Sequence, residues 1–247
     1  MILLIDIGNT RIKWARWSAG RMNEQTAIAH ANLTAERLRA AMIEGAPRPQ
    51  RVLASNVGGA RVGELTAECV KAEWNIEIEF VQSTASAGGV RNAYPEPEKL
   101  GVDRWLAVIA AHAMTPRAAC VVSVGTAMTV DAVDASGRHY GGVIVPGPDM
   151  MIGSLFRSTS EIARRAEQGA ATDSLFADNT RAAVEQGAMH ALAALAERAV
   201  RTFEEQVGET PEFLLTGGAG PRIARALHVP YKLVPDMVLQ GLAVLAC

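Results

Sequence analysis

The sequence predicts an α/β protein built from two similar lobes, each with a mixed sheet flanked by helices. Three observations support this prediction. A three-strand pattern near the start of the chain returns after residue 118, helical segments separate the later strands of each half, and Ser18-Ala19-Gly20-Arg21 has a counterpart in Ala135-Ser136-Gly137-Arg138. We therefore expect an N-terminal lobe at residues 1–115 and a C-terminal lobe at residues 116–247.

The first lobe is predicted to have the order βββαβαβ. Apolar, β-rich runs at Ile2–Ile5 and Ile12–Trp17 are broken by Gly8-Asn9, which predicts a hairpin. A third strand follows the turn at residues 18–21. The remaining elements are expected as helices at Thr34–Glu44 and Arg61–Ala72, which show helical spacing of apolar residues, and as strands at Arg51–Ser55 and Ile76–Val81.

The second lobe is predicted to repeat the three strands after a helix from about Val102 to Met114. The repeated strands are expected at Ala119–Val124, Met128–Val133 and Tyr140–Val145. The rest of the lobe is expected as helices near Asp149–Gln168 and Asn179–Val207, a strand at Glu212–Thr216, a helix from about Pro221, a short strand near Tyr231–Val234 and a final helix from Asp236.

The composition favours an ordered protein with a small-molecule partner. Apolar residues make up 49% of the 247, charged residues 20%, and the formal net charge is −2, so the basic surface of a nucleic-acid binder is not expected. Cys69, Cys120 and Cys247 form no disulfide framework, which favours a reducing compartment, and we expect a cytoplasmic location. No run of residues has the length and apolarity of a membrane span, and the first residues do not resemble a signal peptide, so we expect no membrane partner.

Two glycine-containing loops between strands are candidates for phosphate binding. In Asp6-Ile7-Gly8-Asn9-Thr10, backbone N–H groups and the Thr10 hydroxyl could hold phosphate while Asp6 faces Mg²⁺. The alternative is that Gly8-Asn9 is only a hairpin turn. Gly125-Thr126-Ala127-Met128-Thr129 has the same character and leaves the same alternative open.

A third glycine-rich segment leaves a predicted strand and opens a helix. Gly217 and Gly218, in Leu214-Leu215-Thr216-Gly217-Gly218-Ala219-Gly220, would let an adenosine approach the backbone, although an ordinary strand-to-helix turn also has this pattern. The two loops followed by this turn resemble the phosphate 1, phosphate 2 and adenosine motifs of the actin, sugar kinase and Hsp70 superfamily. This resemblance implies ribonuclease-H-like (actin-like ATPase) lobes. The signatures of P-loop NTPases and of protein kinases do not occur.

The segment from Tyr94 to Trp105 places Asp103 beside Arg104 at a predicted helix start. Asp103 could act as a general base; alternatively it caps the helix and Arg104 is a surface charge. Leu100-Gly101-Val102-Asp103-Arg104 resembles the GxDR motif of type III pantothenate kinases, whose aspartate is the proposed catalytic base. Further matches follow the order of that family along the chain, at Asp6–Thr10, Gly101–Arg104, Gly125–Thr129, Gly141–Gly147, Asn179-Thr180 and Gly217-Gly218.

The resemblance implies ATP-dependent phosphorylation of pantothenate to 4′-phosphopantothenate, the first step of coenzyme A biosynthesis, by a homodimer. It assigns ATP contacts to Asp6, Ile7, Gly8, Asn9, Thr10, Arg11, Ile12, Lys13, Gly125, Thr126, Gly217 and Gly218, with Asp6 holding Mg²⁺ directly or through water. It assigns the substrate pocket to Tyr94, Gly101, Val102, Asp103, Arg104 and Thr180, with Thr180 reaching the substrate across the dimer interface. Asp103 is the expected catalytic residue.

Two positions depart from the family pattern. Many members carry Asp-x-Gly-Thr where this chain has Ser123-Val124-Gly125, and Ile162-Ala163 replaces the usual Leu-Pro. The aspartate would help bind K⁺ or NH₄⁺ near the nucleotide phosphates, so Ser123 predicts weak or no dependence on a monovalent cation.

Two other functions fit parts of the sequence. An actin-fold kinase of a sugar or another small alcohol would share the nucleotide loops, and only the Tyr94–Arg104 segment argues against it. A nucleotide-binding regulatory factor without turnover is the alternative outside enzymes, since relatives of the family were first described as accessory factors in gene regulation. The presence of Asp103 and Thr180 favours catalysis.

Overall fold

The structure is a computed structural model that describes residues 1–166 and 169–246, and it divides into two compact units. Unit 1 comprises Met1–Met114, Ser136–His139 and the chain from Asp236, and unit 2 comprises Thr115–Ala135 and Tyr140–Pro235. The end of the helix expected up to Gln168, and Cys247, lie outside the described residues.

Unit 1 is built on a mixed sheet with the strand order β3-β2-β1-β5-β6, in which β4 pairs with β2. Strand β1 is antiparallel to β2 and parallel to β5, and β5 is parallel to β6. The three-strand start and the two later strands predicted from the sequence are confirmed. The bounds are β1 Ile2–Ile7, β2 Arg11–Ser18, β3 Arg21–Met22, β4 Thr26–Ala29, β5 Arg51–Asn56 and β6 Ile78–Phe80.

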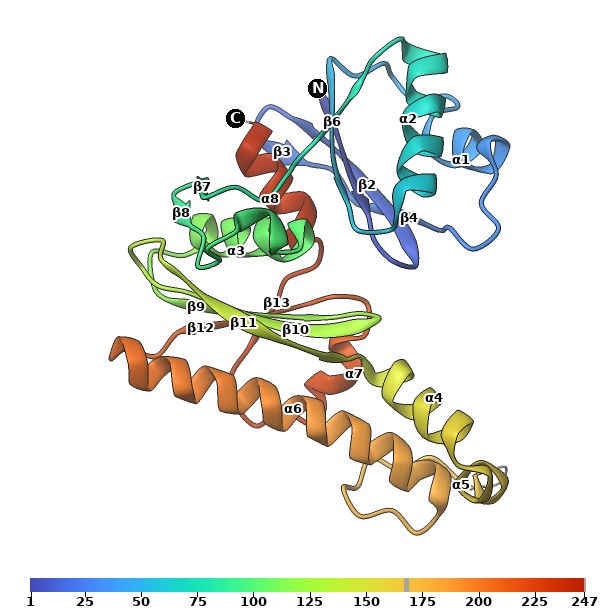
Figure 1. The fold of residues 1–247 in the computed structure, drawn as a ribbon, viewed down its shortest axis with the longest axis vertical. Helices are drawn as coiled ribbons and strands as arrows, with labels where there is room; N and C mark the ends of the chain where they lie inside the picture. Colours follow the sequence, from blue (N-terminus) through green and yellow to red (C-terminus); the bar gives the residue numbers. More distant parts are fainter. Residues whose placement is uncertain (167–168, 247) are drawn as a thin grey trace. The chain divides into compact units, whose positions relative to one another are not determined.

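Helices cover both faces of this sheet, so β1 is buried on both sides (Figure 1). Helices α1 (Ala35–Met42) and α2 (Ala60–Trp74) pack on the face that carries Leu3, Ile5 and Ile7. Helices α3 (Val102–Met114) and α8 (Met237–Ala246) pack on the other face, where Leu4, Ala15 and Leu53 contact Leu106, Leu239 and Leu242. Side chains alternate along a strand, so the next residue of β1 on the second face is Asp6.

The last helix joins unit 1, whereas chain order had placed it with residues 116–247. Helix α8 packs closely against α3, and a Cβ at Gly241 would collide with the backbone of Leu106. Leu239 and Leu242 are completely buried in this contact. Residues of unit 1 therefore cover the apolar faces of α8. This packing explains why α8 does not belong to the lobe that was expected at residues 116–247.

Unit 2 repeats the strand arrangement of unit 1, with the order β11-β10-β9-β12-β13. Strand β9 is antiparallel to β10 and parallel to β12, and β12 is parallel to β13. The predicted return of the three-strand pattern is confirmed. The bounds are β9 Ala119–Val124, β10 Ala127–Val133, β11 His139–Pro146, β12 Glu212–Thr216 and β13 Lys232–Leu233.

One long helix, α6 (Thr180–Val207), lies along one face of the unit 2 sheet (Figure 1). Cys120, Val122 and Val130 form the buried core there with Leu192 and Phe203. The Asn179 side chain caps α6 by accepting a hydrogen bond from the Ala182 N–H at 3.0 Å. A shorter helix, α7 (Gly220–Ala224), follows β12.

Three details differ from the sequence prediction. The helix expected near Asp149–Gln168 is divided at Thr159 into α4 (Pro148–Ser158) and α5 (Ser160–Arg165), because Thr159 has an extended backbone and its hydroxyl bonds to the Leu155 carbonyl at 2.6 Å. A small hairpin of β7 (Ser86–Ala87) and β8 (Val90–Arg91), and the turn η1 (Pro97–Lys99), lie before α3 and were not predicted.

In the described parts of the chain, no helix combines the length and apolarity needed to cross a membrane.

Candidate functional site

A polar row crosses the unit 1 sheet just beyond the apolar row that α3 and α8 cover. Asp6 on β1 lies opposite Lys13 on β2 and Ser55 on β5, so the three side chains share one face. The Ser55 hydroxyl donates to Asp6 Oδ1 at 2.9 Å, and Lys13 Nζ lies 4.0 Å from Asp6 Oδ2. Asp6 is thereby fixed in place.

Two more carboxylates act on this row. Asp103 lies in the first turn of α3, and Asp236 directly precedes α8. Burial raises the pKa of Asp6, Lys13 and Ser55 oppose that rise, and the charges of Asp103 and Asp236 add to it. Burial also raises the pKa of Asp236, against the effect of Lys13. Asp103 and Asp236 therefore both act electrostatically on Asp6.

The raised pKa of Asp6 predicts that its charge opposes folding. The folded protein holds the Asp6 proton more tightly than the unfolded chain does. The free-energy cost of ionising Asp6 in the folded protein is therefore absent below the ordinary pKa of about 3.9, and it grows as the pH rises through the folded-state pKa. Asp6→Asn is therefore expected to raise the free energy of unfolding at pH 7. Urea unfolding between pH 3.5 and 8 measures this, and a variant less stable than the wild type at pH 7 would contradict it.

The first glycine loop is a tight turn held from two sides. The Gly8 N–H donates to the Arg11 carbonyl at 3.0 Å, and His30 Nε2 lies 3.0 Å from the Gly8 carbonyl. Gly58, just after β5, lies so close to Gly8 that a Cβ added at Gly58 would be 2.5 Å from the Gly8 carbonyl oxygen. The loop that is expected to bind phosphate thus has a fixed backbone, as a preorganised anion site requires.

The start of α3 brings together the residues of the GxDR segment. Asp103 Oδ1 accepts a hydrogen bond from the Arg104 N–H at 2.9 Å, and a Cβ at Gly101 would lie 2.7 Å from that oxygen. Gly101 therefore leaves room for the carboxylate. Arg104 is only 6% exposed, so the alternative that it is a solvated surface charge is wrong.

Tyr94 lies beside the buried guanidinium of Arg104. Arg104 donates to the Tyr94 hydroxyl at 3.0 Å, and its guanidinium carbon lies 5.8 Å from the centre of the Tyr94 ring. The Tyr94 ring also stacks with the His139 ring, with 6.5 Å between the two ring centroids. A guanidinium held in this way, with a phenol next to it, can bind a carboxylate.

In unit 2, the second glycine loop contacts two other motifs. The Gly147 N–H donates to the Thr126 carbonyl at 2.8 Å, and a Cβ at Gly147 would collide with Gly125 and Thr126. Gly217 has a φ of +90°, and a Cβ there would collide with Val124. The segments at Gly125, Gly147 and Gly217, which are far apart in sequence, are therefore packed together.

Ser123 occupies in unit 2 the position that Asp6 has in unit 1. It lies two residues before Gly125, as Asp6 lies two residues before Gly8, and it pairs with Thr129 on β10 and with Thr216 on β12. The row that carries a carboxylate, a lysine and a serine in unit 1 carries three hydroxyl groups here. The departure seen in the sequence is thus a loss of charge at an equivalent structural position.

Thr180, the first residue of α6, lines an apolar cavity of about 680 Å³ in unit 2. The other walls come from α4, α5 and α6, including Met151, Leu155, Ile162 and Val184. Thr180 belongs to a different unit from Asp103, Arg104 and Tyr94.

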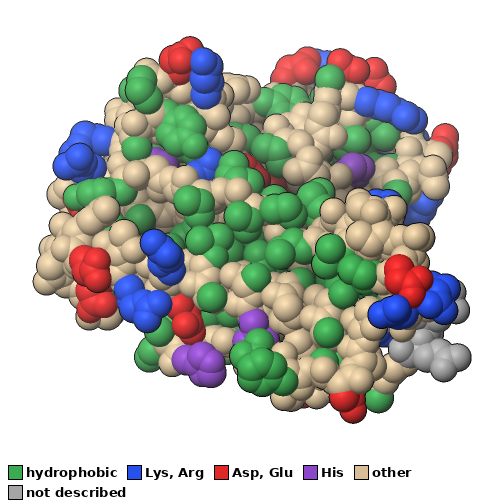
Figure 2. All heavy atoms as spheres, turned by 60° about the horizontal axis from the view of Figure 1, so that its bottom comes forward, with side chains coloured by type: hydrophobic (Ala, Val, Ile, Leu, Met, Phe, Trp, Pro, Cys, Tyr) green, Lys and Arg blue, Asp and Glu red, His purple; other side chains and the backbone are tan. Residues whose placement is uncertain are grey.

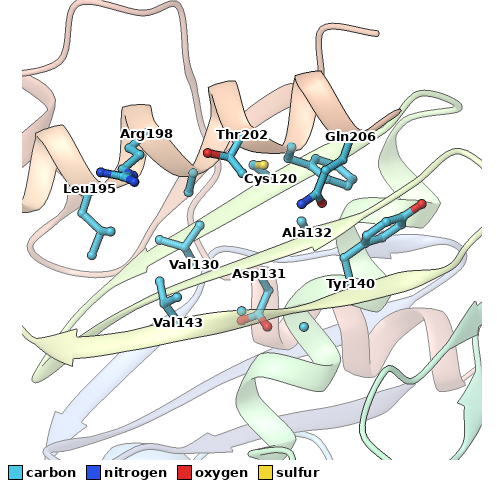
Figure 3. Close-up of a pocket in the computed structure, with 14 residues that line it drawn as sticks. Cys120, Val130, Asp131, Ala132, Tyr140, Val143, Leu195, Arg198, Thr202 and Gln206 are labelled. Carbon is cyan, nitrogen blue, oxygen red and sulfur yellow. The ribbon is translucent and has the colours of Figure 1, made fainter. Parts of the chain in front are cut away.

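A second cavity of unit 2, of about 340 Å³, lies between α6 and the strands β10 and β11 (Figure 3). Val130 and Val143 form its apolar floor, and Arg198, Thr202 and Gln206 extend from α6. Ser123, Thr129 and Thr216 alternate with the residues that face α6, so they lie on the other face of the sheet. None of the predicted site residues lines this cavity.

Sequence reasoning missed Ser55, His30, Gly58 and Asp236. Strand alternation and the pairing of β1 with β5 place Ser55 beside Asp6, but only once the register is known. Asp236 resembles an ordinary residue before a helix, and His30 and Gly58 gave no local signal. Within residues 1–166 and 169–246, no group of three or more His, Cys, Asp or Glu side chains is arranged so that it could hold a metal ion.

Known proteins resemble this chain along nearly its whole length. The family model described as type III pantothenate kinase matches residues 2–202. A type III pantothenate kinase from Nitrosococcus oceani is 37% identical over 248 residues, which cover 98% of this chain and 92% of the relative. Another, from Azoarcus sp., is 40% identical over 253 residues, which cover 100% of this chain and 90% of the relative.

Solved structures share the fold at much lower identity. A protein from Sinorhizobium meliloti described as a 2-dehydro-3-deoxygalactonokinase is 14% identical, with a TM-score of 0.63 over 100% of this chain and 98% of the other. At that identity the likeness shows the fold alone. The expected actin-like ATPase fold, which sugar kinases share, is confirmed.

Proposed function

The chain belongs to the type III pantothenate kinase family, whose activity is the ATP-dependent phosphorylation of pantothenate in coenzyme A biosynthesis, and we propose that Asp103, Arg104 and Tyr94 serve this reaction in this chain. The observation that carries the assignment is the buried Arg104–Tyr94 pair next to Asp103. A buried guanidinium in hydrogen-bonding contact with a phenol suits the carboxylate of pantothenate.

Asp103 is the proposed general base. Its carboxylate accepts the proton of the primary hydroxyl of pantothenate as that oxygen bonds to the γ-phosphorus of ATP, and ADP leaves with the electrons of the broken P–O bond. Arg104 and Tyr94 hold the other end of the substrate. The backbone N–H groups of Gly8 to Lys13 in unit 1, those of Gly125 and Thr126 in unit 2, and the glycines at Gly217 and Gly218 are proposed to contact ATP.

Mg²⁺ fits the residues around Asp6. The site has three carboxyl groups, those of Asp6, Asp103 and Asp236, and Lys13 supplies a single positive charge. Asp236 Oδ1 is buried without a hydrogen-bond partner in the described structure. Mg²⁺ commonly keeps several waters and uses one or two carboxylates plus substrate phosphates, which agrees with the small number of carboxylates here. When bound, the ion would neutralise charge on the phosphate oxygens.

We also propose a homodimer, in the cytoplasm, with Thr180 reaching the substrate of the partner subunit. Large apolar side chains of unit 2 are exposed near the Thr180 cavity. Leu155, which lines the cavity, is 43% exposed, and Ile144, two residues before the lining residue Pro146, is 59% exposed. Figure 2 shows apolar side chains gathered across the middle of the face that it presents, with charged side chains mainly toward its rim. Such a surface supports association between copies of the chain.

A coupled ADP-release assay tests the proposed function. Purified protein with Mg·ATP is expected to release ADP with pantothenate and not with a panel of sugars or other small alcohols. Turnover with a sugar instead would favour the sugar kinase alternative. ADP or ATP binding without turnover on any acceptor would favour the regulatory factor.

The loss of charge at Ser123 predicts weak or no activation by K⁺ or NH₄⁺. The hydroxyl groups of Ser123, Thr129 and Thr216 offer only neutral oxygens to a cation. A partly buried carboxylate at the same place would increase the affinity for the cation by more than a factor of ten, which corresponds to ~1.4 kcal/mol. Ser123→Asp is expected to introduce or strengthen the cation dependence.

The measurement is activity against KCl or NH₄Cl at constant ionic strength, balanced with a bulky organic cation. Thr202→Asp, at an exposed position of α6, is a control for the added charge alone. Strong, saturable activation of the wild type at low cation concentration would contradict the prediction.

A further inference from the structure

The segment Ser136–His139, which leads from β10 into β11, belongs to unit 1 although the chain on either side of it belongs to unit 2. The Arg91 N–H donates to the Gly137 carbonyl at 2.8 Å, and the Arg91 guanidinium donates to the Ser136 hydroxyl at 3.3 Å. A Cβ at Gly137 would lie 2.1 Å from the Gly89 carbonyl oxygen. Close backbone contacts therefore fix this segment on the hairpin of β7 and β8.

The same sequence pattern near the start of the chain makes no such contact. Ser18–Arg21 connects β2 to β3, and its Gly20 has a φ of +75°, close to the +79° of Gly137. A Cβ at Gly20 would meet no atom within 4 Å. The positive φ is therefore a property of the repeated turn itself, whereas the contact with Gly89 is found only in the second copy. This difference indicates a role for the second copy beyond closing the turn.

His139, the last residue of the segment, contacts the loop that carries Tyr94. It is only 1% exposed. His139 Nδ1 accepts a hydrogen bond from the Ala93 N–H at 3.4 Å. The His139 ring stacks with the Tyr94 ring, with an angle of 8° between the two planes. A buried imidazole thus contacts both the backbone and the aromatic ring of this loop.

The loop that carries Tyr94 has little support of its own. Residues 91–99 are all described, and none of them is buried. Within the loop, the Tyr94 N–H donates to the Asn92 side-chain oxygen at 3.0 Å. The Tyr94 hydroxyl accepts a hydrogen bond from Arg104, so the ring is held at its hydroxyl by Arg104 and through stacking by His139. Loss of the His139 ring is therefore expected to let the Tyr94 ring leave its place beside the guanidinium.

We propose that His139 is a positioning residue of the substrate pocket, which holds the Tyr94 ring where its hydroxyl meets the guanidinium of Arg104. His139 acts through Tyr94 and does not contact the substrate. The proposal rests on the proposed function, because it takes the carboxylate of pantothenate as the group that Arg104 and Tyr94 bind. A binding group that is already held in position loses less conformational freedom when the substrate binds, so the support by His139 strengthens substrate binding.

Three substitutions separate the ring of His139 from its hydrogen-bond acceptor. His139→Ala removes both, His139→Phe keeps a flat ring, and His139→Asn keeps an acceptor close to the position of Nδ1. His228→Ala, which removes an exposed histidine of unit 2, is the matched control. Circular dichroism and thermal unfolding check that each variant is folded.

The first measurement compares the KM for pantothenate with the KM for ATP in the ADP-release assay. The KM for pantothenate is expected to rise about tenfold in His139→Ala and His139→Asn, because the energy of a stacked aromatic pair corresponds to a factor of up to about ten. His139→Phe should restore this KM to within about threefold of the wild type. The KM for ATP should stay within about twofold in every variant, whereas a merely structural role of His139 would change both KM values.

A double-mutant cycle shows whether His139 acts through Tyr94. In Tyr94→Ala protein the ring that His139 holds is absent, so the further change His139→Ala should raise the KM for pantothenate by no more than about twofold. An equal, tenfold rise in both backgrounds would overturn the proposal. A folded His139→Ala or His139→Asn protein with the KM of the wild type would also overturn it.

Fluorine NMR of protein labelled with 3-fluorotyrosine gives a readout that does not depend on the reaction. The chain has three tyrosines, and Tyr94→Phe identifies the Tyr94 resonance. This resonance is expected to shift in His139→Ala and to stay in place in His228→Ala. An unchanged resonance in His139→Ala would overturn the role of His139, whether or not the protein phosphorylates pantothenate. The expected shift in a protein that releases no ADP with pantothenate would instead overturn the proposed function.

Discussion

Asp103→Asn is expected to lower kcat about 10²–10⁴-fold, the usual contribution of a positioned general base. The amide oxygen of Asn can still accept the hydrogen bond from the Arg104 N–H, so the start of α3 should keep its geometry. What is lost is a group that can take the proton of the attacking hydroxyl. A loose transition state, in which little proton transfer has occurred, would place the loss near the lower end of this range.

Steady-state kinetics at saturating Mg·ATP and pantothenate measure this loss, and circular dichroism and ADP binding check the fold. Glu98→Gln is a suitable control, because Glu98 is an exposed carboxylate of the same segment. It should retain kcat within twofold. A folded Asp103→Asn enzyme that turns over within threefold of the wild type would show that Asp103 is not the base.

The repeated strand pattern was predictable from sequence because it depends on local alternation and turns. Ile2–Ile5 and Ala119–Val124 are apolar strands that end in glycine-containing turns, and both start a mixed sheet in the structure. Alternation also places Asp6 on the face opposite Ile5 and Ile7. The loops of the candidate site were predictable for the same reason, since each follows a strand.

The parts that sequence did not predict depend on long-range packing. Arg104 could be a surface charge by its local sequence, and it is buried because α3 is covered by α8 and Tyr94 reaches its guanidinium. Asp236 is 130 or more residues in sequence from Asp6 and Asp103, and its backbone is left-handed, with a φ of +65°. A residue before an apolar helix carries no local sign of either feature.

Gly147 illustrates a third case, in which the sequence marks a residue and the structure supplies the reason. It stands at the end of the Gly141–Gly147 segment and is buried at the start of α4, with a φ of −71° that any residue can adopt. The requirement for glycine is therefore one of space. The atoms that a Cβ would meet are backbone atoms of Gly125 and Thr126, which cannot rotate away.

Gly147→Ala is expected to displace the second glycine loop and to impair ATP use. Either the loop moves, which would raise the KM for ATP about tenfold or more, or the strain remains and lowers the free energy of unfolding by about 1–3 kcal/mol, the usual cost of overpacking. The hydrogen bond from the Gly147 N–H to the Thr126 carbonyl makes movement of the loop the expected response, because the two backbones are joined. Initial rates against ATP concentration and urea unfolding measure the two effects.

Gly187→Ala is the matched control, since Gly187 is an exposed glycine within α6 and a Cβ there would meet no atom within 4 Å. Alanine has the higher helix propensity, so this variant should be more stable than the wild type by about 0.5–1 kcal/mol, with an unchanged KM for ATP. The contrast between the two variants isolates contact with the loop from the general effect of replacing glycine. If Gly147→Ala matched the wild type in both KM for ATP and stability, the close contact of Gly147 with Gly125 and Thr126 would not hold the loop in place. The second glycine loop would then owe its conformation to β9, β10 and the neighbouring Gly217 alone.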